Sequence, residues 1–105
     1  MFNSDDPMYF FKGQVMKELS KRLTKNVSIK IYYKEEGDFV GIILSAADNP
    51  SADSIRMYRI DDPYEIIKLG ESPAALCEKF TQDYKNFLIG RYFKKEKRHE
   101  NYSYI

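Results

Sequence analysis

Few residues in this chain are able to do acid–base, nucleophilic or metal chemistry. His99 is the only histidine and lies in a charged C-terminal stretch, where we expect it to be solvated. Cys77 is the only cysteine and falls in a helical apolar pattern, where a buried thiol is expected rather than a nucleophile. A single cysteine forms no internal disulfide, and without a second Cys or His nearby we expect no zinc site.

Carboxylates form two clusters along the chain. The six residues are Glu35, Glu36, Asp38, Asp61, Asp62 and Glu65. Paired acids can do acid–base work or bind divalent cations, but these occupy turn and helix-start positions, which already account for them. The sequence has neither a phosphate-binding glycine loop nor a Gly-x-Ser-x-Gly motif. We therefore expect no enzyme activity, no catalytic or metal-binding residue and no cofactor.

Basic and aromatic residues suggest a different chemistry. Lys30, Tyr32 and Lys34 alternate with apolar residues, so they would line an open sheet face, and we expect Arg56 and Tyr58 of a neighbouring strand to join them. Lysines that contact phosphates and aromatic rings that stack on bases are typical of sheets that bind single-stranded nucleic acid. A second basic group lies near the C-terminus: Arg91, Lys94, Lys95, Lys97 and Arg98. The alternative is an ordinary solvated face, since the solvent-exposed faces of antiparallel strands also carry Lys and Tyr.

The charge is segregated along the chain, although the formal net charge is only +1. Residues 8–34 hold seven Lys and Arg against one Glu, and residues 35–83 hold eleven acids against four bases. Residues 84–105 hold six bases against two acids. Such segregation affects partners and association rates rather than fold. It arises either by chance or because the acidic middle docks on a basic protein groove.

The elements that must position these residues follow from periodicity. Apolar residues recur every three or four positions after Asp6-Pro7 and predict a helix as far as Leu23. Alternation over 27–34, a turn at 35–38 and an apolar run over 39–45 predict a hairpin, in which Gly41 marks a bulge or a close packing contact. A third strand is expected at 55–60 and one or two helical turns at 62–70. A long helix follows Ser72-Pro73, and we expect it to fray after Lys95.

This order predicts one α+β domain over residues 1–95, followed by a charged, aromatic and mobile tail at 96–105. The arrangement is helix, three strands, short helix, long helix. A three-stranded antiparallel meander would bury one face under the two long helices, which leaves the other face open.

The stretches "KEEGDFVGI" and "SIRMYRIDDPYEIIKLGES" resemble a domain family of unknown function from bacterial and mobile-element genomes. The resemblance covers roughly residues 10–90 and depends on Lys34, Gly37, Gly41, Tyr58, Tyr64 and Gly70. Glu35 and Glu36 stand where the family has Asn. Since the family has no assigned activity, the resemblance implies a fold and no functional residues.

The sequence also leads to expectations about the cellular location and the binding partners of the protein. No apolar run approaches the roughly 18 residues of a membrane helix, and "MFNSDDPMYF" lacks the features of a signal peptide. We expect a cytoplasmic protein that does not bind membranes. The first hypothesis is a small accessory or inhibitor-type protein that binds a partner protein through its acidic loops. The alternative is nucleic-acid binding through the open face and the basic end of the last helix, and a homodimer through an edge strand is a third possibility.

Overall fold

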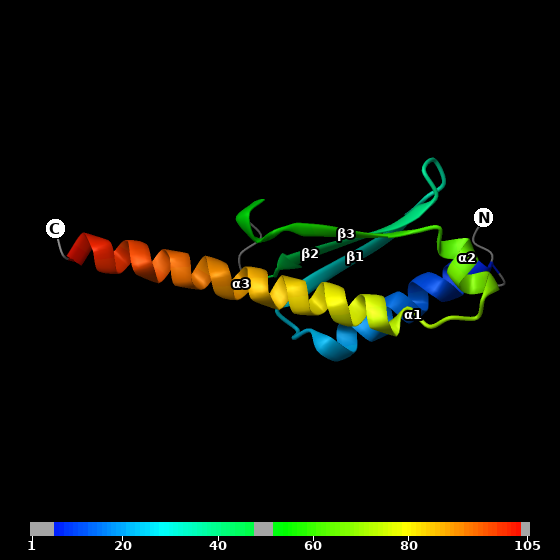
Figure 1. Cartoon of the computed structure of the whole chain (residues 1–105), viewed down its shortest axis with the longest axis horizontal. Coiled ribbons are helices and arrows are strands. Elements are labelled where there is room, and N and C mark those ends of the chain that lie inside the picture. Colours follow the sequence, from blue (N-terminus) through cyan, green and yellow to red (C-terminus); the bar gives the residue numbers. More distant parts are fainter. Residues whose placement is uncertain (1–5, 48–51, 104–105) are drawn as a thin grey trace.

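The structure, a computed structural model, describes residues 6–47 and 52–103, and for residues 52 and 91–103 it describes the backbone alone. The elements in chain order are α1 (Pro7–Arg22), β1 (Val27–Lys34), β2 (Phe39–Ala46), a 3-10 turn (Ala52–Ser54), β3 (Arg56–Asp61), α2 (Pro63–Lys68) and α3 (Ala74–Ser103). Figure 1 shows this order, which confirms the predicted succession of helix, three strands, short helix and long helix.

Helix α1 begins where the sequence predicts. The Asp6 carboxylate accepts a hydrogen bond of 2.9 Å from the Met8 N–H, and Pro7 occupies the first helical position. The helix ends at Leu23, whose N–H donates to the Leu19 carbonyl. Its buried side chains recur at helical spacing: Met8, Phe11, Val15 and Leu19. These four residues fix which side of α1 faces the core.

The three strands form an antiparallel sheet in the order β1-β2-β3. Pairing runs without interruption from Lys34 opposite Phe39 to Val27 opposite Ala46, so β2 contains no bulge at Gly41. Gly41 instead makes a close packing contact, because the Tyr32 ring of β1 lies directly over it. Of the two interpretations open for Gly41, the structure supports the packing contact.

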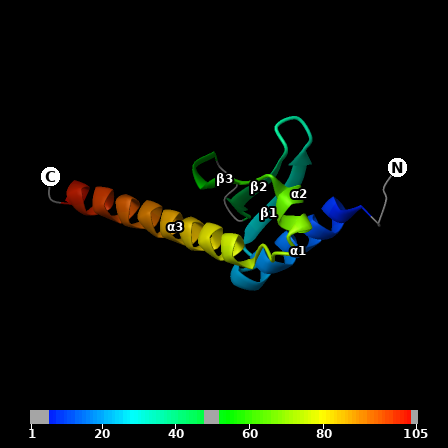
Figure 2. The same cartoon turned by 45° about the vertical axis from the view of Figure 1, so that its right-hand side comes forward.

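Helices α1 and α3 lie on one face of the sheet, and the other face is open (Figures 1 and 2). The covered face contributes Val40, Ile42 and Leu44 of β2 to the core, all fully buried. Cys77 and Tyr84 of α3 complete that core from the helix side. This two-layer arrangement confirms the predicted α+β fold. Among the described residues, no helix has the length and apolar content needed to cross a membrane.

Helix α3 extends well past the sheet (Figure 1). Its backbone is helical as far as Ser103, beyond Lys95, where we expected the helix to fray. The predicted tail at 96–105 therefore includes helical backbone over 96–103, whereas its last two residues and all its side chains lie outside the described part of the chain. The molecule is elongated as a result, with principal extents of 61 × 27 × 26 Å.

Candidate functional site

The structure brings the two predicted acidic segments together. Pairing of β2 with both neighbours places the turn after β1 beside the junction of β3 and α2, and the Asp62 N–H donates to the Asp38 carbonyl at 3.2 Å. We call this cluster the acidic corner; it consists of Glu35, Glu36, Asp38, Asp61, Asp62 and Glu65. Five of the six side chains are exposed, and Asp38 is half-buried.

Backbone conformation at the acidic corner depends on two aspartates. Asp38 and Asp62 have φ angles of 49° and 50°, and they are the only described residues other than glycine with positive φ. Aspartate tolerates this left-handed region better than most residues, because its short side chain hydrogen-bonds locally. Asp38 ends the turn with an N–H bond to the Glu35 carbonyl, and Asp62 precedes α2. Both turns therefore direct acidic residues to the same end of the sheet.

Most charges in the acidic corner form no ion pair with the residues that the structure describes. Asp61 pairs with Arg59 at 2.8 Å, an exposed contact of small energetic value. In the described part of the chain, the other five carboxylates form no ion pair. Five of the six carboxylates of the acidic corner therefore stand outside the ion pairs of the described residues.

Two tyrosines, Tyr33 and Tyr64, lie against the acidic corner. Tyr33 donates a hydrogen bond of 2.7 Å to the Asp38 carboxylate, and this bond, with partial desolvation, raises the pKa of Tyr33 to about 12. Desolvation and then the charges of Asp6, Asp38 and Glu35 raise the pKa of Tyr64. The two rings meet edge to face with centroids 5.7 Å apart. The field of the acidic corner thus disfavours any further negative charge there.

No cluster of three or more His, Cys, Asp or Glu side chains that could hold a metal ion occurs in residues 6–47 and 52–90, which include the acidic corner. Cys77 is fully buried, and burial raises the pKa of its thiol to about 11. This pKa keeps the thiol protonated near neutral pH, so the structure gives it no nucleophilic character.

The second predicted site is divided between the two faces of the sheet. Lys30, Tyr32 and Lys34 lie on the open face, as expected. Arg56 and Tyr58 lie on the covered face, because they share it with Ile60, whose side chain is 2% exposed in the core. The expectation that these two residues join the lysines is therefore wrong.

Contacts with α3 hold Arg56 and Tyr58 on the covered face. The Tyr58 hydroxyl donates to the Asp83 carboxylate at 2.5 Å, and its ring stacks on Phe80 with centroids 5.1 Å apart. Arg56 pairs with Asp83 at 3.4 Å and lies over the Phe87 ring at 4.9 Å. Desolvation and the bond to Asp83 raise the pKa of Tyr58. Both residues serve the attachment of α3 to β3.

Arg59 is the cation that sequence reasoning missed on the open face. Its guanidinium lies 4.0 Å from the centre of the Phe39 ring, which meets Tyr32 edge to face. The alternation within β3 would have identified it once Ile60 was assigned to the core. The five predicted cations near the C-terminus, Arg91, Lys94, Lys95, Lys97 and Arg98, belong to the α3 extension, and their side chains lie outside the described residues.

The chain matches no protein-family model. It also matches no curated protein and no solved structure. The resemblance to a family from bacterial and mobile-element genomes accordingly stays a prediction.

Proposed function

We propose that this protein is a non-catalytic interaction module whose acidic corner binds a basic surface of a partner protein. The observation that supports this most is the hydrogen bond from Asp62 to Asp38, which holds two acidic segments, separate in sequence, at one end of the sheet. Charge complementarity of this kind gives fast and specific association between proteins. An accessory or inhibitor-type role fits such a surface, and a cytoplasmic location stays a prediction.

The electrostatics of the acidic corner favour a cationic partner over an anionic one. Five carboxylates that form no ion pair with any described residue indicate a negative potential, and charges of the acidic corner add to the hydrogen bond and the desolvation that raise the pKa values of Tyr33 and Tyr64. A phosphate backbone would be repelled there, whereas Lys or Arg side chains would exchange water for charge-assisted hydrogen bonds. This preference distinguishes the proposal from nucleic-acid binding.

Nucleic-acid binding is the second candidate, and one observation favours it. Arg59 joins Lys30 and Lys34 on the open face, where Tyr32 and Phe39 supply aromatic rings. Two of the residues first expected in that site, Arg56 and Tyr58, are engaged by α3 instead. The open face therefore keeps three cations and two aromatic rings, with Arg59 and Phe39 in the places expected of Arg56 and Tyr58.

A titration with two opposite probes tests the proposal. The purified protein is added to fluorescein-labelled octa-arginine, and separately to a labelled single-stranded DNA oligonucleotide, and fluorescence anisotropy is followed. Measurements at ionic strengths of about 0.01 M and 0.15 M span Debye lengths of roughly 30 to 8 Å. We expect binding of the cationic peptide that weakens with salt and little binding of the DNA. Tight, salt-dependent binding of DNA alone would favour the second candidate.

A charge-reversed variant locates the binding. Glu35→Lys/Glu36→Lys removes two attractive contacts and adds two repulsive ones, each worth about 0.3–0.5 kcal/mol at an exposed site. The sum of about 1.2–2 kcal/mol corresponds to a loss of affinity for octa-arginine of roughly ten- to thirty-fold. Glu71→Lys/Glu78→Lys is the matched control, since both residues are exposed, lie outside the acidic corner and change the net charge equally. Equal weakening by both variants would refute a role for the acidic corner.

A further inference from the structure

A polar pocket of about 430 Å³ adjoins the acidic corner, where the N-terminus of α1, the end of β1 and the start of α2 come together. Its volume lies in the range of roughly 300–1,000 Å³ that is usual for ligand sites in proteins. Glu35 lines this pocket and also belongs to the acidic corner, whereas Asp6, which caps α1, supplies a carboxylate from outside it. We call this site the tyrosine pocket; its polar and aromatic lining consists of Asp6, Tyr9, Lys12, Tyr33, Glu35 and Tyr64.

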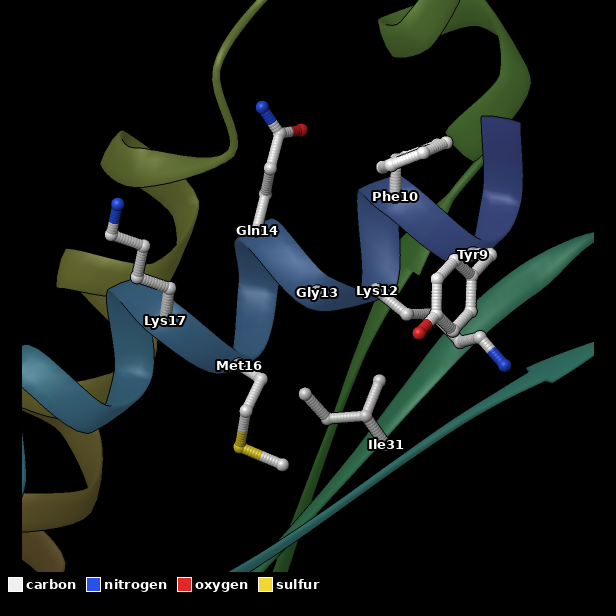
Figure 3. A pocket seen from close by; sticks show the side chains of 8 residues that line it. All are labelled: Tyr9, Phe10, Lys12, Gly13, Gln14, Met16, Lys17 and Ile31. Atoms are coloured by element: carbon white, nitrogen blue, oxygen red, sulfur yellow. The ribbon is translucent and has the colours of Figure 1, made fainter. Parts of the chain in front are cut away.

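Three tyrosine side chains line the tyrosine pocket from different elements: Tyr9 of α1, Tyr33 of β1 and Tyr64 of α2. The Tyr33 and Tyr64 rings are perpendicular to each other, with centroids 5.7 Å apart, so they form two adjoining walls. Figure 3 shows Tyr9 and Lys12 extending from α1 on the side that faces the strands, away from Phe10. Tyr9 and Tyr64 are 40% and 43% exposed, which leaves part of both side chains open to a ligand.

The tyrosine pocket carries more negative than positive charge. Asp6 and Glu35 line it against one cation, Lys12, and none of the three forms an ion pair with a described residue. Desolvation raises the pKa of Tyr64, and the charges of three carboxylates raise it further: Asp6, Asp38 and Glu35. These carboxylates therefore lie close enough to act together on a charged group inside the pocket.

Carboxylates beside exposed aromatic rings are surroundings that suit an arginine side chain. A guanidinium is planar and stacks on aromatic faces, and its five N–H donors point outward in that plane. Asp6 and Glu35 can accept hydrogen bonds from those donors while a tyrosine ring contacts the flat face. A lysine ammonium is compact and strongly hydrated and has no such face, and an anion would be repelled by the two carboxylates. The tyrosine pocket therefore favours arginine over lysine and over anions.

We propose that the tyrosine pocket binds one arginine side chain of the partner protein. This inference rests on the proposed function, because the acidic corner supplies the general attraction for a basic surface and the pocket selects one residue of that surface. Arginines held in pockets are common hot spots of protein–protein interfaces. The proposal adds Asp6 and the three tyrosines to the binding surface. It also makes Lys12 an opposing charge, since an ammonium repels a guanidinium.

Two neighbouring glutamates distinguish the tyrosine pocket from the acidic corner as a whole. Glu35 lines the pocket and Glu36 is not among its lining residues, although both are exposed and belong to the same turn. Loss of a pocket contact should make Glu35→Gln bind fluorescein-labelled octa-arginine roughly fivefold more weakly at an ionic strength of about 0.15 M. Glu36→Gln, the matched control, should bind it about twofold more weakly at most. Equal losses would overturn the pocket and leave the proposed function intact, whereas no binding by the wild type at low salt would overturn both.

A comparison of two peptides of equal charge tests the choice of arginine. The wild type should bind octa-arginine roughly fivefold more tightly than octa-lysine, because a guanidinium both stacks on the rings and donates to the carboxylates. Tyr64→Leu should abolish this preference, since leucine keeps the apolar bulk and removes the ring. Tyr32→Leu should keep it, because Tyr32 lies on the open face outside the pocket, and circular dichroism verifies that both variants fold. A wild type without the preference, or a preference that survives Tyr64→Leu, would overturn the proposal.

Charge variants at the start of α1 test the tyrosine pocket without altering its rings. Asp6→Asn removes the second carboxylate and keeps the helix cap, because asparagine caps a helix about as well as aspartate. The affinity of this variant for octa-arginine should fall about threefold. Lys12→Gln removes the opposing cation and should raise that affinity about threefold, more than Lys17→Gln, which removes a cation of α1 outside the pocket. An affinity unchanged in Asp6→Asn, or raised equally by both lysine variants, would overturn the proposal.

Discussion

Replacing Gly41 with alanine should have opposite effects on stability in two backgrounds. An added Cβ atom at this position would overlap the Tyr32 ring, which lies across the glycine on the open face. The ring must then swing away, since it is the flexible partner. Its edge-to-face contact with Phe39, whose centroid lies 6.2 Å away, would be lost with it.

The magnitude follows from these contacts. Loss of the aromatic pair costs about 1 kcal/mol, and re-exposure of roughly 40 Å² of ring costs about 1 kcal/mol more. Alanine regains about 1 kcal/mol relative to glycine inside a regular element. The free energy of unfolding of Gly41→Ala should therefore fall by about 1 kcal/mol. In a Tyr32→Ser background only the stabilisation by alanine over glycine remains, so Gly41→Ala should raise the free energy of unfolding by about 1 kcal/mol.

Urea unfolding followed by far-ultraviolet circular dichroism measures all four members of this double-mutant cycle. We expect a coupling energy of about 2 kcal/mol between Gly41 and Tyr32, which is well above the additivity limit for independent sites. Gly41→Val, with a larger side chain, should lose more stability in the wild-type background. If Gly41→Ala destabilised both backgrounds equally, the backbone rather than the ring would require glycine, and the reasoning would be refuted.

Two further predictions concern buried or bonded tyrosines. Tyr84→Phe removes the 2.8 Å hydrogen bond to the buried Ser54 carbonyl, and should lower the free energy of unfolding by about 1–2 kcal/mol in urea titrations; an unchanged midpoint would contradict it. The folded-state pKa of Tyr33, raised to about 12, exceeds its value of about 10 in an unfolded chain. The folded protein therefore holds this proton more tightly, and the stabilisation, complete below pH 10, should be lost as the pH rises from about 10 to 12. Tyr33→Phe should lose less stability over that interval in thermal unfolding, and identical slopes would show that the bond to Asp38 does not matter.

The elements were predictable because their signals are local. The capping aspartate and proline at the start of α1, the alternation in β1 and the glycine turn each depend on residues a few positions apart. These signals give the succession of elements and the central position of β2. They left Gly41 as either a bulge or a packing contact, because the choice depends on which β1 residue lies opposite it, and that residue is Tyr32.

The functional surfaces were less predictable, because they depend on distant contacts. The faces of Arg56 and Tyr58 were assigned wrongly since "IRMYRI" offers apolar residues to either face. The burial of Ile60 decides that Arg56 and Tyr58 lie on the covered face. Their contacts with Asp83, more than twenty residues later in the chain, stabilise this arrangement. The acidic corner was predicted as a pair of segments, but their contact depends on the hydrogen bond between Asp62 and Asp38, which no local pattern encodes.

The extension of α3 has a hydrodynamic consequence. A body of 61 × 27 × 26 Å tumbles more slowly end over end than about its long axis. Amide N–H vectors in a helix point along its axis, so those of α3 should relax with the slow tumbling time, whereas many sheet amides should sample the faster one. Nuclear spin relaxation would then separate the amides of α3 from those of the sheet. The ratio of transverse to longitudinal relaxation rates along α3 would report over what length this helix remains straight in solution.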